Sequence, residues 1–195
     1  DIMNFLLSHN DMDGYGCILS ALKAYEKCTY MNIGYGDIVE TLQYMDNNIN
    51  DVDIIYITDL KFDELCSIEL YKLVKHHTNI SFIYVDHHPF ETEKQLKIFE
   101  KLKEFVNFKL IHTEKRCATY IFYKYLLSQN VLTYNEDYEK VMTIIDSFDT
   151  WKDDAPTFKA GVALNDVFYD WKKQRFLTEL LTNNKISDDM KNTMR

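Results

Sequence analysis

The sequence has few residues that interrupt regular secondary structure, with only five glycines and two prolines in 195 residues. Long loops and disordered segments are usually rich in such residues and poor in aromatic ones, whereas aromatic residues make up 14% of this chain. Hydrophobic residues make up 46% and charged residues 27%, as is ordinary for a folded protein with a buried core. We therefore expect regular elements joined by short connections.

Basic residues are too few to balance the acidic ones, since 22 Lys and Arg against 31 Asp and Glu give a formal net charge of −9. Proteins that bind long nucleic acids are usually basic, at least on one face. The charge therefore argues against long duplex nucleic acid as a partner. It does not exclude short phosphorylated substrates, and bound cations would cancel the charge of any carboxylates that hold them.

The cysteines are also few, and they form no C-x-x-C pair: they are Cys17, Cys28, Cys66 and Cys117. This spacing predicts neither a zinc knuckle nor a dense disulfide frame, so we expect free thiols in a reducing cytoplasm. The sequence has no signal peptide and no apolar run long enough to span a bilayer, so no membrane association is expected.

Up to residue 112, apolar runs typical of buried strands alternate with stretches typical of helices. The predicted strands are Asn4–Leu7, Thr29–Ile33, Ile54–Thr58, Ile80–Val85 and Phe108–Ile111, and the predicted helices between them are Gly14–Lys27, Ile38–Met45, Glu64–His76 and Glu91–Phe105. This alternation predicts an α/β fold, in which a parallel five-stranded sheet is flanked by helices on both faces.

Beyond residue 112, helix is expected to follow helix. Ala118–Ser128, Tyr138–Phe148 and Phe168–Leu181 carry apolar residues at helical spacing, and the polar tail Ser187–Arg195 is expected to fray. We expect one α/β domain over residues 1–150, followed by a short helical extension over 151–195 with no recognisable second substrate-binding domain.

Acidic and imidazole side chains follow three of the predicted strands. Asp11 and Asp13 come after the first, Asp59 ends the third, and Asp86-His87-His88 end the fourth. Ligands of open parallel sheets bind beyond the carboxyl ends of the strands, so these groups are expected to converge. Clustered carboxylates repel one another unless cations lie among them, and mixed His and Asp donors suit Mn²⁺, Zn²⁺ or Fe²⁺ better than Ca²⁺. The pattern predicts a site where two metal ions activate water and clamp a phosphoryl group.

Each of these segments also has a purely structural interpretation. The run Asp11 to Gly14 is a common turn or helix cap, and Asp59 at a strand end says little alone. Two adjacent histidines at the exit of a buried strand rarely serve packing, so His87-His88 favours function. We interpret His76-His77 as structural, because imidazolium at a helix C-terminus stabilises the helix dipole. No pattern decides the role of His112, which we also interpret as structural.

Four segments, taken in order, resemble the DHH phosphoesterase superfamily, which is named for its Asp-His-His triplet. They are Ser8-His9-Asn10-Asp11-Met12-Asp13-Gly14, Thr58-Asp59, Val85-Asp86-His87-His88-Pro89 and Ile145-Asp146-Ser147-Phe148-Asp149-Thr150-Trp151. The resemblance covers the chain from about Asn4 to Trp151 and is nearest to the oligoribonuclease and cyclic-nucleotide phosphodiesterase-like branch. It implies a hydrolase with two Mn²⁺ ions per chain, Mg²⁺ or another divalent cation being the alternative.

The resemblance also implies roles for the matching residues. His9 and Asp11 would bind the first ion, Asp59 would bridge to the second, and Asp13, His87 and Asp146 would complete the second site, with Asp149 as the alternative to Asp146. Asp86 would orient an imidazole, while His88 would contact the scissile phosphate. Arg116 would contact phosphate oxygens, or else be a solvated residue at the start of a helix.

The expected function is that of a phosphodiesterase acting on short oligonucleotides or nucleotide second messengers, in which a metal-bridging hydroxide attacks phosphorus. One alternative is a RecJ-like single-strand exonuclease, which would need a larger basic channel with stacking aromatics. Another is a non-catalytic module that binds a nucleotide or a partner protein, and a homodimer is left open. Many relatives close a second, glycine-rich domain over the substrate, and the five glycines of this sequence form no such motif.

Overall fold

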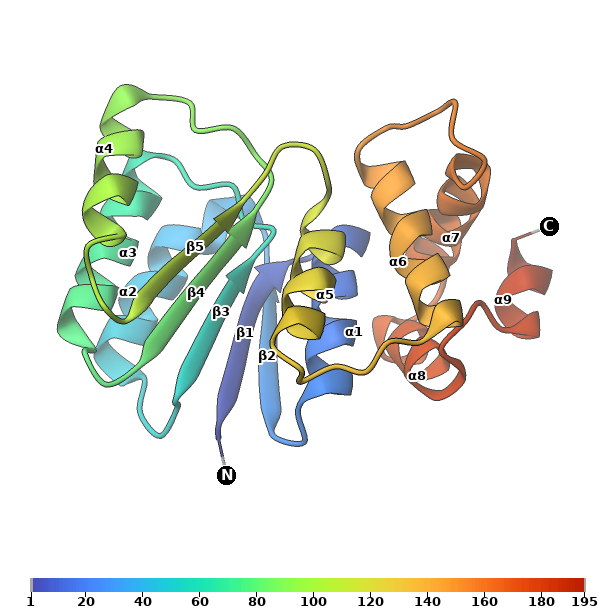
Figure 1. The fold of residues 1–195 in the computed structure, drawn as a ribbon, viewed down its shortest axis with the longest axis horizontal. Coiled ribbons are helices and arrows are strands. Elements are labelled where there is room, and N and C mark those ends of the chain that lie inside the picture. The colour runs from blue at the N-terminus through green and yellow to red at the C-terminus, as the bar shows by residue number, and fades with distance from the viewer. Residues whose placement is uncertain (1, 195) are drawn as a thin grey trace.

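Five parallel strands form the centre of the molecule, which is described over residues 2–194 in a computed structural model (Figure 1). The strands are β1 (Asn4–His9), β2 (Cys28–Ile33), β3 (Ile54–Thr58), β4 (Ser81–Asp86) and β5 (Phe108–His112). Their order is β2-β1-β3-β4-β5, so the chain changes direction across the sheet between β1 and β3. The predicted α/β fold with a five-stranded parallel sheet is confirmed, and its ligand-binding edge is expected at this change of direction.

Helices cover both faces of the sheet. One face packs against α2 (Ile38–Asn48), α3 (Glu64–His76) and α4 (Glu93–Leu102), and the other against α1 (Met12–Ala24) and α5 (Ala118–Ser128), as Figure 1 shows. Alternate residues of β1 serve the two layers, since Leu6 lies in the core beneath α1 and α5 while Leu7 lies in the core beneath α2 and α3. Between β2 and α2 lies a short 3₁₀ helix, η1 (Tyr35–Asp37).

A helical layer lies outside α1 and α5 and comprises α6 (Glu136–Asp149), α7 (Phe158–Asp170), α8 (Lys173–Asn183) and α9 (Asp188–Thr193) (Figure 1). Its apolar side chains belong to the same core as those of α1 and α5. The helix predicted over Phe168–Leu181 is wrong: the chain is extended at Trp171, which is buried, so α7 ends at Asp170 and α8 begins at Lys173.

The expectation of a frayed tail is also wrong for residues 187–194. The Ser187 side chain accepts a hydrogen bond from the backbone N–H of Met190 and so caps α9, and the Met190 side chain is fully buried. Arg195 lies outside the described residues.

The four cysteines are free thiols, as expected. Over residues 2–194, the helices are each too short or too polar to cross a bilayer.

The turn from β1 into α1 places the chain so closely against itself that residue 14 must be glycine. Asp11 caps α1, because its Oδ1 accepts a hydrogen bond of 2.9 Å from the Gly14 N–H. Ser8 Oγ lies 3.0 Å from Gly14 O, which holds the turn against β1. A Cβ atom at position 14 would lie only 1.9 Å from the backbone oxygen of His9. The close approach orients His9 and Asp11 at the end of β1.

We predict that Gly14→Ala lowers the free energy of unfolding by about 2 kcal/mol or more, because the turn must move to admit the methyl group. Gly36→Ala is the matched control, since a Cβ there would meet no atom within 4 Å, and it should change the free energy of unfolding by less than about 1 kcal/mol. Equilibrium urea unfolding measures both. Equal midpoints for the two variants would contradict this reading of the turn.

Candidate metal centre

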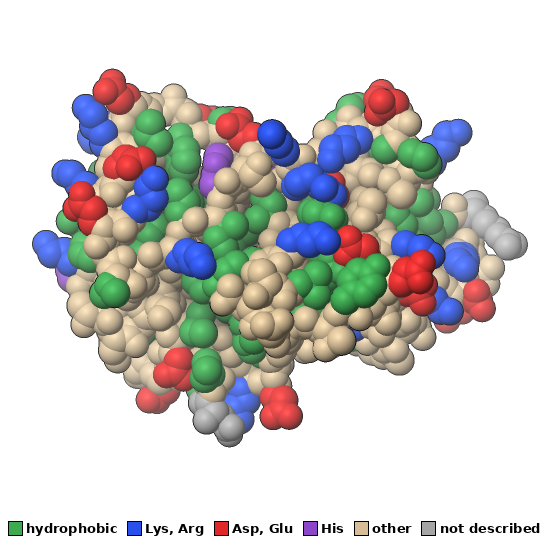
Figure 2. Space-filling view, viewed as in Figure 1, with side chains coloured by type: hydrophobic (Ala, Val, Ile, Leu, Met, Phe, Trp, Pro, Cys, Tyr) green, Lys and Arg blue, Asp and Glu red, His purple; other side chains and the backbone are tan. Residues whose placement is uncertain are grey.

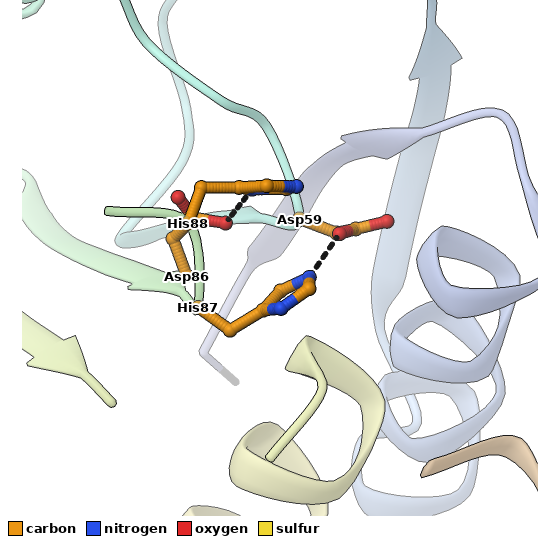
Figure 3. A group of neighbouring side chains, drawn as sticks. All are labelled: Asp59, Asp86, His87 and His88. Atoms are coloured by element: carbon orange, nitrogen blue, oxygen red, sulfur yellow. Dashed lines mark hydrogen bonds and ion pairs between the residues drawn. The ribbon is translucent and has the colours of Figure 1, made fainter. Parts of the chain in front are cut away.

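The acidic and imidazole side chains that follow β1, β3 and β4 meet at one edge of the sheet, as the sequence predicts. Two groups have potential ligand atoms within 4.8 Å of one another: His9 with Asp11 and Asp59, and Asp13 with His87 and Asp149. Asp59 also belongs to a third group of this kind, with Asp86, His87 and His88 (Figure 3). Asp59 therefore lies where it can contribute to two adjacent metal sites.

The first group contains two buried polar atoms that lack a hydrogen-bond partner. His9 Nδ1 lies 3.1 Å from Asp11 Oδ2 and 3.7 Å from Asp59 Oδ2, in geometries that form no hydrogen bond. Asp59 Oδ2 is likewise unpaired, although Asp59 is almost fully buried. Buried polar groups are rarely left unpaired, so these atoms fit the ligands of a cation better than they fit a structural cluster.

In the second group, three carboxylates converge on one ring nitrogen. His87 Nε2 lies 3.4 Å from an oxygen of Asp13, 3.3 Å from one of Asp59 and 3.4 Å from one of Asp149. Figure 3 shows the His87 ring pointing from the end of β4 towards Asp59. Imidazole and carboxylate donors at such spacing suit Mn²⁺ and similar transition metals.

The N-terminus of α5 holds Asp13 in place. The consecutive backbone N–H groups of Ala118 and Thr119 donate to its two oxygens at 3.1 and 2.8 Å. The first turn of a helix favours negative charge, because its N–H groups lack partners within the helix. This contact orients a fully buried carboxylate without adding another charged side chain.

Burial and mutual repulsion perturb the pKa values of the cluster. Burial, followed by the charges of Asp13 and Asp11, raises the pKa of Asp59 well above its ordinary value. Burial and the charge of Asp13 raise the pKa of Asp149 to about 9. Burial lowers the pKa of His87, but the hydrogen bond with Asp13 and its charge outweigh that effect and raise it to about 9. Without cations the cluster therefore holds protons that divalent ions would displace.

The backbone of Asp59 is strained. Its φ is 56°, in the left-handed region that residues with side chains adopt at a cost of about 1–3 kcal/mol. The Asp59 N–H donates to Val85 O at 3.1 Å, which ties the strained residue to β4. Such strain persists where surrounding structure fixes it, and the Asp59 carboxylate lies between His9 of the first group and His87 of the second.

A chain of hydrogen bonds orients His88. Its Nδ1–H donates to Asp86 Oδ1 at 2.8 Å, and its backbone oxygen accepts a hydrogen bond of 2.6 Å from His112 Nε2. The hydroxyl of Tyr84 lies 3.5 Å from the other oxygen of Asp86. His88 Nε2 is therefore left facing the site, as Figure 3 shows for the ring of His88 above Asp59. His112, interpreted as structural, supports His88 through this backbone contact.

Tyr35 is a member of the site that sequence reasoning missed. Its ring stacks on His9 with centroids 4.0 Å apart, and its hydroxyl lies 3.4 Å from His88 Nε2. Burial and the charges of Asp59 and Asp11 raise the pKa of Tyr35, so its hydroxyl stays protonated. The signal was available, because Tyr35 follows β2 at the same edge of the sheet as the other site residues.

Asp146, the predicted ligand of the second ion, lies in neither ligand group. Asp146 Oδ1 accepts a hydrogen bond of 2.7 Å from the Cys117 N–H, while Oδ2 accepts from Arg116 Nε at 2.8 Å and contacts Lys152 Nζ at 3.1 Å. Both oxygens of Asp146 are thus bound to basic side chains or to the backbone. Asp149, one turn further along α6, lies with Asp13 and His87 instead. The predicted helix Tyr138–Phe148 contains Asp146 but stops one residue short of Asp149, whereas α6 continues to Asp149.

The pair His76-His77 lies away from this cluster, at the end of α3. His76 Nδ1 and His77 Nε2 each lie 2.9 Å from a carboxylate oxygen of Asp46 in α2. These contacts join two helices, which agrees with the structural interpretation, although Asp46 supplies the partner in addition to the helix dipole.

We predict that Asp59→Asn stabilises the metal-free protein at neutral pH by about 1 kcal/mol or more and abolishes the rise in Tm that Mn²⁺ causes in the wild type. The pKa of Asp59 is raised in the folded state, so its ionised form costs stability above its ordinary pKa of 3.8 and the gain grows as the pH rises from there. Thermal unfolding in EDTA and in Mn²⁺ measures both effects.

The control for that experiment is Asp166→Asn, at an exposed position of α7. This variant should have the Tm of the wild type both in EDTA and in Mn²⁺. A metal-free Asp59→Asn protein that is less stable than the wild type, or one that keeps the Mn²⁺ shift, would contradict the account of the cluster.

Comparison with known proteins found no protein-family model that matches the chain. Among curated proteins, the chain is 27% identical over an alignment of 171 residues, which covers 86% of the chain, to the oligoribonuclease NrnB of Bacillus subtilis (strain 168), a DHH-family protein. The matched region covers 41% of that protein, so the chain spans about two fifths of the length of its curated relative.

Among solved structures, the fold is similar to an uncharacterized protein from Helicobacter pylori G27, with a TM-score of 0.64 and 22% sequence identity. The similarity covers the whole of this chain and 55% of the other. At this identity the likeness shows the fold alone. Together with the match to NrnB, the convergence of the DHH triplet with the Asp11, Asp13 and Asp59 carboxylates confirms the predicted resemblance of this chain to the DHH phosphoesterase superfamily.

Proposed function

We propose that this chain is a metal-dependent phosphodiesterase that hydrolyses short oligoribonucleotides. The observation that carries the proposal is the pair of adjacent ligand groups at the carboxyl ends of the strands, with Asp59 in the first group and 3.3 Å from His87 Nε2 of the second. The name of the relative NrnB supports short RNA as the substrate class, and the net charge of −9 disfavours long nucleic acids.

The donor sets fit two divalent cations. His9, Asp11 and Asp59 would hold the first, and Asp13, Asp59, His87 and Asp149 the second. Manganese is the metal that we propose, because mixed imidazole and carboxylate ligands suit it. Two such ions lower the pKa of a water molecule and neutralise negative charge on the phosphoryl group.

The protein's own contribution to the reaction is to orient the substrate. Asp86 accepts the proton of His88 Nδ1, which fixes the ring so that Nε2 faces the site. The hydroxyl of Tyr35, 3.4 Å from this nitrogen, lies on the same side. Since Nδ1 is held by Asp86, Nε2 is the ring nitrogen left to contact a phosphoryl oxygen of the substrate, and the hydroxyl of Tyr35 can donate beside it.

The proposal predicts that, with Mn²⁺, the protein releases mononucleotides from di- to pentaribonucleotides, and that EDTA stops the release. His88→Asn should lower the rate about 10²–10³-fold, because a positioned donor to the phosphoryl group is lost. His76→Asn removes an exposed imidazole far from the site and should leave the rate unchanged. Ion-exchange chromatography of the products measures the rates.

Release that persists in EDTA, or that survives His88→Asn, would contradict the proposed mechanism. Tight binding of nucleotides without metal, together with no hydrolysis, would favour the alternative of a non-catalytic nucleotide-binding module.

A second prediction separates the two aspartates of α6. Asp149→Asn should reduce the bound manganese from two equivalents towards one, because a ligand of the second ion is lost. Asp146→Asn should retain two equivalents, because Asp146 binds Arg116, Lys152 and the Cys117 N–H instead. Elemental analysis of desalted protein measures the metal, with circular dichroism as a check on folding. Loss of manganese in Asp146→Asn but not in Asp149→Asn would restore Asp146 as the ligand.

A further inference from the structure

Two cations share one oxygen of a buried carboxylate beside the metal centre. Arg116 Nε and Lys152 Nζ lie 2.8 and 3.1 Å from Asp146 Oδ2, and Asp146 itself is only 1% exposed. The side chains of Arg116 and Lys152 remain 36% and 39% exposed. One negative charge thus holds two positive ones, so the cluster presents a net positive charge at the surface of an acidic protein.

Arg116 is bound in a way that leaves its outer donors available. It contacts Asp146 through Nε, and neither of its Nη groups has a hydrogen-bond or ion-pair partner among residues 2–194. The guanidinium group lies over the ring of Tyr120, with Cζ 3.5 Å from the ring centroid. Asp146 and Tyr120 together fix the plane of the guanidinium group, and a fixed fork of N–H donors suits the oxygens of a phosphate.

Lys152 reaches Asp146 because the chain makes a sharp turn after α6. Trp151 has a φ of 54°, in the left-handed region, and the Lys152 N–H donates to Ser147 O at 2.9 Å. A tryptophan in this conformation costs about 1–2 kcal/mol. The turn brings Lys152 back along α6 to a carboxylate that Arg116 already neutralises.

The cation pair and the metal centre are held by the same helix ends. Asp146 and Asp149 are one turn apart on α6, about 4.5 Å along its axis. At the start of α5, the Cys117 N–H binds Asp146, while the next two N–H groups bind Asp13. Figure 2 shows Lys and Arg side chains gathered on this face, over α5 and beside the notch that separates it from α6.

We propose that Arg116 and Lys152 form a second phosphate subsite, which binds the phosphate next to the scissile one, and that Asp146 is the positioning residue that holds them. The inference rests on the proposed function, because the metal centre defines where the scissile phosphate lies. It assigns Asp146 a role in substrate binding in place of metal binding, and it makes Lys152 a substrate contact.

Dinucleotides with and without a terminal phosphate test the subsite. With Mn²⁺, the wild type should have a higher kcat/KM for a dinucleotide that carries a 5′- or a 3′-terminal phosphate than for the unphosphorylated one. Arg116→Met and Lys152→Met should each reduce that preference about tenfold or more, because a charge-assisted hydrogen bond is lost. Arg116→Lys should restore only part of it, because lysine lacks the planar fork.

The control is Lys124→Met, which removes the same charge from an exposed lysine of α5 that pairs with Glu139 at 3.2 Å. This variant should keep the preference of the wild type. A binding measurement makes the test independent of turnover. In calorimetric titrations of the wild type, adenosine 3′,5′-bisphosphate should bind more tightly than adenosine 5′-monophosphate. Arg116→Met and Lys152→Met should each remove this difference in affinity.

The outcomes separate the two proposals. The subsite would be overturned if kcat/KM were the same with and without the terminal phosphate, or if the preference remained in both Arg116→Met and Lys152→Met. Either result would leave the proposed function standing and would mean that the two cations only balance the charge of the acidic cluster. If no dinucleotide is cleaved but the bisphosphate preference is present and is lost in the variants, the subsite stands and the proposed function fails. Equal binding of the bisphosphate and the monophosphate by the wild type would overturn the subsite.

Discussion

Four carboxylates, those of Asp11, Asp13, Asp59 and Asp149, are crowded together at the carboxyl ends of the strands, and Asp13 and Asp59 are almost completely buried. Charges of one sign at such distances repel strongly in a medium of low polarity. Much of the local structure serves to hold them there. Backbone N–H groups at the N-terminus of α1 and at the N-terminus of α5 donate hydrogen bonds to Asp11 and Asp13, respectively. The His87 ring lies among three carboxylate oxygens. The repulsion that remains is what bound cations would relieve.

Holding this cluster requires rigid support from both sides. The β1–α1 turn is so tight that a side chain at Gly14 would collide with β1, and Asp59 is kept in a strained backbone conformation between β3 and β4. The helical layer contributes as well, because α6 supplies Asp149 and packs through Val141 and Ile145 into the core that contains α1 and α5. The second ligand group therefore depends on contacts between the sheet and a helix that follows it in the sequence.

The sequence predicts most of the fold and the main members of the site for a simple reason. Buried parallel strands appear in a sequence as short apolar runs, and the residues that follow such strands lie at one edge of the sheet. The sequence alone therefore predicts that Asp59 and the Asp86-His87-His88 triplet lie at that edge. Local patterns could not choose between Asp146 and Asp149. Both lie on α6 one turn apart, and the choice depends on where Arg116 and Cys117, about 30 residues earlier, meet the helix. The break at Trp171 also escaped prediction, because apolar spacing continues across it.

The central claim is that the two adjacent ligand groups hold two metal ions and that Asp59 is a ligand of both. Anomalous diffraction at the manganese edge, from crystals of the protein grown with Mn²⁺, tests it most directly. The account predicts two peaks: one within bonding distance of His9, Asp11 and Asp59, and the other within bonding distance of Asp13, Asp59, His87 and Asp149. A single peak, or peaks that leave Asp59 uncoordinated, would contradict it.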